Sequence, residues 1–355
     1  MEFAQKNTQE FELFLKYSEE IGRDNSMVQA AGGNTSIKID NNMWVKASGK
    51  WLINSKCEEI MVPVIIDKIK DCLQKDNCSD KDIINCVNLD LLANDLRPSV
   101  EAPMHAILDF KYVFHTHDIN VNILAVQKNS KSKFEVILNG LNWKFIPYIK
   151  PGIDLCHQLI KLKSKEDNIF ILENHGLIIC GQDLNQVRSL NDEVRKRLNR
   201  LETRTVISNN KKLHEKIDLE GTGYQFCEER FINSLAFNQQ LIQRLSQGAL
   251  LPDFLVFLGP NLKVISPTDK NLLSTLKKLS KSPLPLNSCI ILENNGVIIR
   301  NDALKGTLEI IRYACNLISL IPDHAELKYL NKSESSALLD WESEHYRQSQ
   351  NKSKL

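Results

Sequence analysis

Two nine-residue stretches of this 355-residue chain are nearly identical, and no other feature constrains the fold as much. The first is ILENHGLII at 171–179 and the second is ILENNGVII at 291–299, an offset of 291 − 171 = 120 residues. Only the pairs 175/295 and 177/297 differ. Apolar runs of this length predict buried strands, and the shared frame predicts one strand environment used twice. Because Asn295 stands in the second copy where His175 stands in the first, we expect the functional chemistry to be confined to the first copy.

The length of the chain suggests about two domains of roughly 150 residues each. A polar stretch at 207–223, ISNNKKLHEKIDLEGTG, marks the predicted linker between a first domain at 1–206 and a second at 224–355. One matched unit is too little for a solenoid, so the repeat indicates a partial duplication or two related domains.

Hydrophobic periodicity predicts helices and strands in both domains. In the first domain the predicted strands are 35–39, 43–47, 111–117, 145–149 and 168–179, and the predicted helices are an N-terminal amphipathic one, 99–109, 153–162 and 185–201, with helix and loop over 57–96. In the second domain the predicted order is helix 227–247, strands 254–258 and 263–266, helix 270–280, strand 288–299, helix 302–320 and a last helix near 333–347.

The composition is that of an ordinary globular protein and points to no large charged or lipid partner. A net charge of +1 creates no field that would favour nucleic acid or an acidic membrane. No apolar run approaches the ~18 residues that would cross a bilayer. The nine cysteines contain no Cys-x-x-Cys pair, which indicates neither a disulfide framework nor a thiolate zinc site. We therefore expect a soluble, cytoplasmic protein without a nucleic-acid or membrane partner.

The stretch Tyr-Val-Phe-His-Thr-His at 112–117 is the most informative local motif. Side chains alternate along a strand, so His115 and His117 face the same way and can both reach one metal ion. His175 is a third candidate, beside Gly176, which permits close backbone approach or a bulge. Three histidines with one open position are the arrangement of a catalytic Zn²⁺ ion, and other divalent transition metals also suit imidazole. The alternative is three histidines packed separately as structural residues.

A carboxylate and two turns complete the candidate site. Glu101 precedes the histidine pair and is either a proton carrier, a fourth ligand, or an ordinary acid at a helix start. His105, one turn later, is interpreted as a residue that supports the structure or the site. The turns Gly-Gly-Asn-Thr-Ser at 32–36 and Ser-Gly-Lys at 48–50 offer backbone N–H groups, hydroxyls and a cation to an anion.

In this order the motifs resemble the class II aldolase/adducin family. The resemblance covers about residues 8–205 and rests on Gly-Gly-Asn-Thr-Ser at 32–36, Trp-Val-Lys-Ala-Ser-Gly at 44–49, Ser99-x-Glu101 with His105, His-x-His at 115–117, and Asn-His-Gly at 174–176. Ile-Pro-Tyr-Ile-Lys-Pro-Gly at 146–152 is similar to the family's segment before its last helix–strand unit. The family includes fuculose- and rhamnulose-phosphate aldolases, ribulose-phosphate 4-epimerases, a methylthioribulose-phosphate dehydratase and the non-enzymatic adducin head.

The resemblance implies an α/β fold class, an α/β/α sandwich around a largely antiparallel sheet. A smaller, related α/β domain without metal ligands would follow it. The resemblance implies that His115, His117 and His175 are metal ligands and that Glu101 is the catalytic acid or base. It also implies a homo-oligomer, commonly a tetramer with active sites between subunits. It places a further set of residues along the substrate- and phosphate-binding side: Gly33, Asn34, Ser48, Gly49 and Ser99.

Three departures from the family's pattern bear on the substrate. Val100 stands where the phosphate-binding aldolases tend to have a second serine. The interval from His105 to His115 is shorter than in the familiar aldolases. No tyrosine is matched to the one with which fuculose-type enzymes protonate the leaving aldehyde.

The implied function is a metal-dependent lyase that cleaves or forms a C–C bond of a small ketose or ketose phosphate through a metal-stabilised enediolate. Because other reactions share that intermediate, the alternatives are an epimerase, a dehydratase or a decarboxylase acting on a sugar phosphate or sugar acid. A non-enzymatic, adducin-like binding module is the competing class. The complete set of histidines and Glu101 disfavours it for the first domain.

Overall fold

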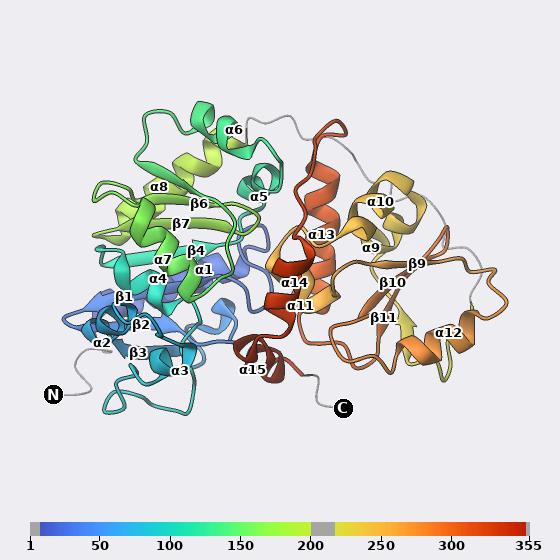
Figure 1. Ribbon diagram of the computed structural model, residues 1–355, viewed down its shortest axis with the longest axis horizontal. Coiled ribbons are helices and arrows are strands. Elements are labelled where there is room, and N and C mark those ends of the chain that lie inside the picture. The colour runs from blue at the N-terminus through green and yellow to red at the C-terminus, as the bar shows by residue number, and fades with distance from the viewer. Residues whose placement is uncertain (1–7, 200–216, 353–355) are drawn as a thin grey trace. The chain divides into compact units, whose positions relative to one another are not determined.

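The computed structural model describes residues 8–199 and 217–352, which form two compact units (Figure 1). The first unit contains residues 8–125 and 129–199. The second contains residues 126–128 and 217–352, and within it Gln127 pairs with Leu327. Residues 207–216 of the predicted linker lie outside the described residues. Of the helices that are described, none is both long enough and apolar enough to cross a bilayer.

Seven strands form the sheet of the first unit, in the order β3-β2-β1-β4-β7-β6-β5. Neighbouring strands are antiparallel except β5 and β6, which are parallel. The strands are β1 Asn34–Ile39, β2 Asn42–Lys46, β3 Met61–Ile65, β4 Tyr112–Thr116, β5 Trp143–Ile146, β6 Ile169–Leu172 and β7 Gly176–Gly181.

Successive side chains of a strand point to opposite faces of the sheet, and here both sets are apolar, so both faces are buried. In β7, Leu177 and Ile179 belong to the core cluster that includes α1, α5, α6 and α8. Ile178 and Cys180 belong to the other cluster, with α2, α3, α4 and α7. The first unit is therefore an α/β/α sandwich, as predicted. Its helices are α1 Gln9–Arg23, the 3₁₀ turn η1 Leu52–Asn54, α2 Ile66–Leu73, α3 Asp80–Ile84, α4 Ala102–Ile107, α5 Ile119–Ala125, α6 Ser130–Ile137, α7 Ile153–Leu162 and α8 Leu184–Leu198.

The second unit has a four-stranded sheet in the order β8-β11-β10-β9, in which only β9 and β10 are parallel. Its strands are β8 Tyr224–Phe226, β9 Lys263–Ile265, β10 Cys289–Leu292 and β11 Gly296–Arg300. Its helices are α9 Arg230–Ser234, the 3₁₀ turn η2 Leu235–Phe237, α10 Gln239–Gln247, α11 Pro252–Leu258, α12 Leu272–Leu279, α13 Thr307–Leu320, α14 Lys332–Leu339 and α15 Glu342–Gln350.

The two near-identical stretches fold alike, but not as the single strands predicted at 168–179 and 288–299. Each forms two antiparallel strands joined by a tight turn, between Leu172 and Gly176 in the first copy. Each turn contains an asparagine with positive φ, 51° at Asn174 and 55° at Asn294. Asparagine adopts this left-handed conformation more readily than most residues, and a strand cannot continue through it. The sheet order β4-β7-β6-β5 recurs as β8-β11-β10-β9.

The contacts around the two turns also correspond. In each unit the turn's first amide donates to the preceding parallel strand, and its second amide donates to α5 in the first unit and to the 3₁₀ turn η2 in the second. An ion pair joins the residue before α5 or α9 to the helix after the hairpin. The contacts are Glu173 to Ile146, Asn174 to Ala125 and Asp118 with Arg195 in the first unit, and Glu293 to Ile265, Asn294 to Ala236 and Glu229 with Arg312 in the second. The sequence repeat is therefore part of a larger structural repeat.

Several other predictions are confirmed and some are wrong. The helices α1, α4, α7, α8, α12 and α13 and the strands β1, β2, β4 and β9 lie within or close to the predicted ranges. Residues 254–258 are helical, because the short apolar run follows Pro252, a residue suited to the first turn of a helix. The predicted helix 227–247 is interrupted at Asn238, whose side chain caps α10 by accepting from the Leu241 amide. The segment 57–96 contains a strand, β3, that was not predicted.

The expectation of no disulfide framework also needs correction. Cys72 and Cys78, six residues apart, are joined by a disulfide at the end of α2. The other seven cysteines are free thiols, and all of them are buried except Cys57. A single pair at this spacing matches no recognised cysteine pattern, which is why the sequence did not indicate it.

We predict that Arg244 is a main stabilising residue of the second unit. Its guanidinium donates to the carbonyl oxygens of Ile318 and Ile321, both at 2.9 Å, and of Pro322 at 2.8 Å, where α13 ends. Arg244→Met keeps the apolar stem but removes the guanidinium donor from the carbonyls of Ile318 and Ile321, so the free energy of unfolding should fall by about 2–4 kcal/mol. Urea denaturation followed by circular dichroism measures this change.

The matched control is Lys278→Met on the exposed side of α12. This substitution should change the free energy of unfolding by less than about 0.5 kcal/mol. Equal effects of the two substitutions would contradict the role given to Arg244.

Candidate metal centre

Three histidines from two neighbouring segments meet at one end of the first sheet. His115 lies in β4 and His117 directly follows that strand, so both point the same way, as predicted. His175 belongs to the turn between β6 and β7 and not to the interior of a strand. Because β7 pairs with β4, with Leu177 opposite Thr116, this turn lies beside the end of β4.

Gly176 is required for this approach. A Cβ atom at this position would lie 2.3 Å from the Thr116 carbonyl oxygen and 3.3 Å from ring atoms of both His115 and His117. Only a residue without a side chain allows His175 to reach the other two rings.

The three imidazoles form a compact, buried group. Their ring centroids are 4.8–5.3 Å apart, and their possible ligand atoms all lie within 4.8 Å of one another. Within residues 8–199 and 217–352, no second group of three potential metal-binding side chains occurs. The Nδ1 atom of His115 is 3.0 Å from the Leu177 carbonyl oxygen, which can only accept a hydrogen bond. Nδ1 therefore carries the proton, and Nε2 offers its lone pair to an ion.

Glu101 lies against this group from the start of α4. Its Oε2 is 3.6 Å from His115 Nε2 and its Oε1 is 3.6 Å from His175 Nε2. Burial alone would raise the pKa of Glu101, but His115, His175, the Asn34 amide and His117 together outweigh burial and lower it to about 2. A buried, ionised carboxylate beside three nitrogen donors fits a divalent cation.

Asn34 connects Glu101 to Ser99 and His105, which are not among the three candidate metal ligands. Its Nδ2 donates to Glu101 Oε2 at 2.7 Å and to Ser99 Oγ at 3.2 Å. Its Oδ1 is 2.5 Å from Nε2 of His105. Asn34 was predicted to lie in an anion-binding turn, but it is the first residue of β1 and pairs with His115. The structure thus brings Asn34 and Ser99 into direct contact with Glu101.

The other predicted residues lie around this group. Gly33 has φ +59°, and a Cβ there would lie 2.9 Å from the His115 carbonyl oxygen. Ser48 and Gly49 form the turn after β2, and the Ser48 amide donates to Arg97, two residues before Ser99. This turn therefore runs beside the segment that leads to Glu101.

One residue of the site was not predicted. Asn122 in α5 is fully buried and donates through Nδ2 to the carbonyl oxygen of His175 at 3.2 Å. Its only signal in the sequence is an amide within the apolar stretch Ile-Asn-Val-Asn-Ile-Leu-Ala at 119–125.

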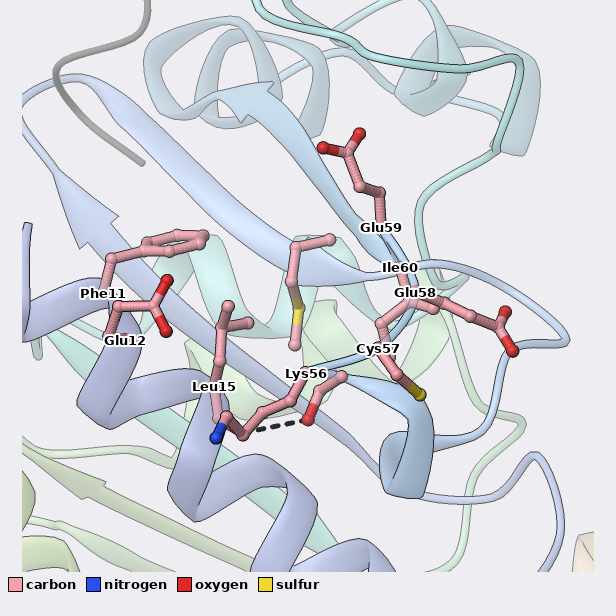
Figure 2. A pocket seen from close by; sticks show the side chains of 10 residues that line it. Phe11, Glu12, Leu15, Lys56, Cys57, Glu58, Glu59 and Ile60 are labelled. Carbon is pink, nitrogen blue, oxygen red and sulfur yellow. Dashed lines mark hydrogen bonds between the residues drawn. The ribbon is translucent and has the colours of Figure 1, made fainter. Parts of the chain in front are cut away.

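A separate surface pocket of about 250 Å³ lies between α1 and residues 55–61 (Figure 2). Phe11 and Leu15 of α1 face this segment, whereas the carboxylates of Glu58 and Glu59 point away from the helix. None of the three histidines or Glu101 lines it, so it is not part of the candidate metal centre.

One curated relative matches part of the chain. A 174-residue stretch is 28% identical to a Bacillus subtilis (strain 168) protein described as "Uncharacterized oxidoreductase YuxG", covering 46% of this chain and 25% of that protein. The chain thus spans about a quarter of this curated relative.

Two solved structures are among those similar to this chain. The N-terminal class II aldolase domain of a conserved Thermoplasma acidophilum protein is 23% identical, with a TM-score of 0.48, over 54% of this chain and 93% of that chain. An L-fuculose-1-phosphate aldolase from Thermus thermophilus is 12% identical, with a TM-score of 0.33, over 52% and 92% of the two chains.

The comparison with protein families covers the whole first unit except its ends. Residues 12–198 match the Class II Aldolase and Adducin N-terminal domain, which is 198 − 12 + 1 = 187 of the 355 residues and more than half of the chain. This match and the buried histidine group show that the chain belongs to the class II aldolase and adducin family.

Proposed function

We propose that the first unit is a divalent-metal-dependent lyase that cleaves or forms a C–C bond of a small ketose or ketose phosphate. The observation that carries this proposal is the position of Glu101, whose two oxygens each lie 3.6 Å from a histidine Nε2. An ionised carboxylate at this position can exchange a proton with a substrate bound beside the histidines.

The residues of this chain would divide the work as follows. His115, His117 and His175 would hold the cation, and the Leu177 carbonyl and the Asn122 amide would orient two of them. When bound, a divalent ion such as Zn²⁺ supplies Lewis acidity toward the carbonyl oxygen of a ketose. Glu101 would take a proton from the neighbouring carbon, or return one to it.

The alternatives within the family use the same residues. An epimerase, a dehydratase or a decarboxylase would also need Glu101 or a neighbouring group to transfer one proton. Identification of the products therefore distinguishes these reactions. An adducin-like binding module is disfavoured, because burying an ionised carboxylate among imidazoles costs stability that a scaffold has no reason to sacrifice. A homo-oligomer, tetrameric by resemblance to the family, is part of the same proposal.

We propose a supporting role for the second unit. The turn that holds His175 in the first unit holds Asn295 in the second. Phe226 faces Ile298 as His115 faces Ile178, so Phe226 and Glu228 occupy the places of His115 and His117. A phenyl ring and an amide at two of three positions remove the basis for a second metal centre.

We predict that the purified protein binds about one divalent transition-metal ion per chain. His117→Ala should reduce this content to near zero, because two remaining imidazoles hold such an ion far more weakly. Elemental analysis by mass spectrometry, after reconstitution with Zn²⁺, Mn²⁺ or Co²⁺, gives the stoichiometry. His324→Ala is the matched control, since His324 is exposed and belongs to the second unit. If the reconstituted protein binds no ion, or if both variants bind equally, the metal centre is refuted.

We predict that Glu101→Gln retains the metal but lowers kcat by about 10²- to 10⁴-fold. Glutamine preserves the shape and can still accept from Asn34, but it cannot take up a proton. A panel of ketoses and ketose phosphates, assayed for release of an aldehyde, measures this effect. Turnover without aldehyde would assign one of the alternative reactions, and no turnover of any ketose would favour the binding module.

A further inference from the structure

A chain of buried hydrogen bonds leads from Glu101, at the start of α4, to His105, about one turn further along the helix. Asn34 Nδ2 lies 2.7 Å from Glu101 Oε2, and Asn34 Oδ1 lies 2.5 Å from His105 Nε2. His105 Nδ1 is in turn 2.8 Å from Ser36 Oγ. The side chains of His105 and Ser36 are fully buried, so water cannot substitute for a missing partner.

With a neutral His105 ring, only one arrangement of protons satisfies every contact in this chain. Asn34 Nδ2 donates to Glu101 Oε2 and to Ser99 Oγ, so the carbonyl oxygen of Asn34 faces His105. His105 Nε2 must then carry a proton and donate. A neutral ring with a proton on Nε2 has none on Nδ1, so Nδ1 accepts from the Ser36 hydroxyl. Burial lowers the pKa of His105 to about 3, which agrees with a neutral ring.

This arrangement lets the side chain of His105 act on the carboxylate of Glu101 through Asn34. An Asn amide has nearly the same shape in its two flipped orientations. The flipped one would place the Asn34 oxygen against the Glu101 oxygen, and the donor at His105 Nε2 prevents this by requiring the oxygen on its own side. The second NH₂ hydrogen of Asn34 points to Ser99 Oγ at 3.2 Å, which also accepts from the Glu101 amide at 3.2 Å.

We propose that His105 is a positioning residue: through Asn34 it holds the Glu101 carboxylate in the orientation that faces the three histidines. The proposal rests on the proposed function, in which Glu101 exchanges a proton with the substrate. It extends that function to His105, whose side chain acts on the Glu101 carboxylate through Asn34.

Kinetics with matched variants test the proposal. His105→Leu removes the donor and should lower kcat about 10- to 100-fold, the loss expected when a catalytic group is misplaced, with metal content unchanged. His105→Gln places an amide NH₂ near the former Nε2 and should restore kcat to within about threefold of the parent chain. Asn34→Ala should lower kcat by the same factor as the double variant Asn34→Ala/His105→Leu, because each single substitution already breaks the same chain of hydrogen bonds. His157→Leu, at a half-buried histidine of α7, is the control and should leave kcat unchanged.

A spectroscopic readout separates this inference from the proposed function. Nitrogen-15 NMR of histidine-labelled protein should show a neutral ring protonated on Nε2 that disappears in His105→Gln. If the signal assigned to His105 shows a ring protonated on Nδ1, or a charged ring at neutral pH, the inference is overturned whatever the activity. If His105→Leu keeps full kcat while Glu101→Gln loses it, the inference fails and the function stands. If no ketose is turned over, the function fails and the NMR spectrum alone decides on the orientation of Asn34.

Discussion

The approach of the β6–β7 turn to the end of β4 is the constraint on which the candidate site depends. The turn carries His175, β4 carries His115 and leads to His117, and a Cβ at Gly176 would lie 2.3 Å from the Thr116 carbonyl oxygen. Backbone pairing sets this distance, since Leu177 lies opposite Thr116. The three imidazoles are thus brought together by the sheet itself and not by flexible loops. Such a site has a preorganised backbone, because separating the segments that carry the rings would require breaking the β4–β7 pairing.

The same backbone geometry serves two different purposes in this chain. In the second unit an identical sheet order and a similar positive φ at Asn294 produce the same hairpin, yet Asn295 occupies the place of His175. The shared Ile-Leu-Glu-Asn frame therefore supports the strand–turn–strand geometry, as its glutamate and asparagine amides donate to equivalent carbonyls in both units. The two frames differ at the positions of the potential metal ligands, which agrees with the general separation of fold from function.

The sequence could predict the histidine group because the motifs are local and strand periodicity places His115 and His117 on one face. It could not predict that 168–179 is a hairpin, because the hydrophobic pattern alone does not distinguish one long buried strand from two strands joined by a three-residue turn. The strand predicted at 254–258 was wrong for a related reason, since short apolar runs occur in buried helices as well as in strands. The contact of Asn122 with His175 depends on how α5 packs beside the hairpin, and no spacing within the sequence encodes that.

The position of Asn34 changes the expectation for the substrate. By resemblance to the family, Asn34 and Ser99 lie on the phosphate-binding side, but the two NH₂ hydrogens of Asn34 are directed at Glu101 and Ser99 and its oxygen at His105. An amide has no further hydrogen to offer, so it could bind a phosphate only by releasing Glu101 or Ser99. With Val100 in place of a second serine, the anionic end of a substrate would depend on the Ser48 hydroxyl and the backbone of the turn at 48–50. Under the proposed function Asn34 accordingly belongs with Glu101, the group proposed to transfer a proton, and an uncharged ketose would suit these side chains as well as a ketose phosphate.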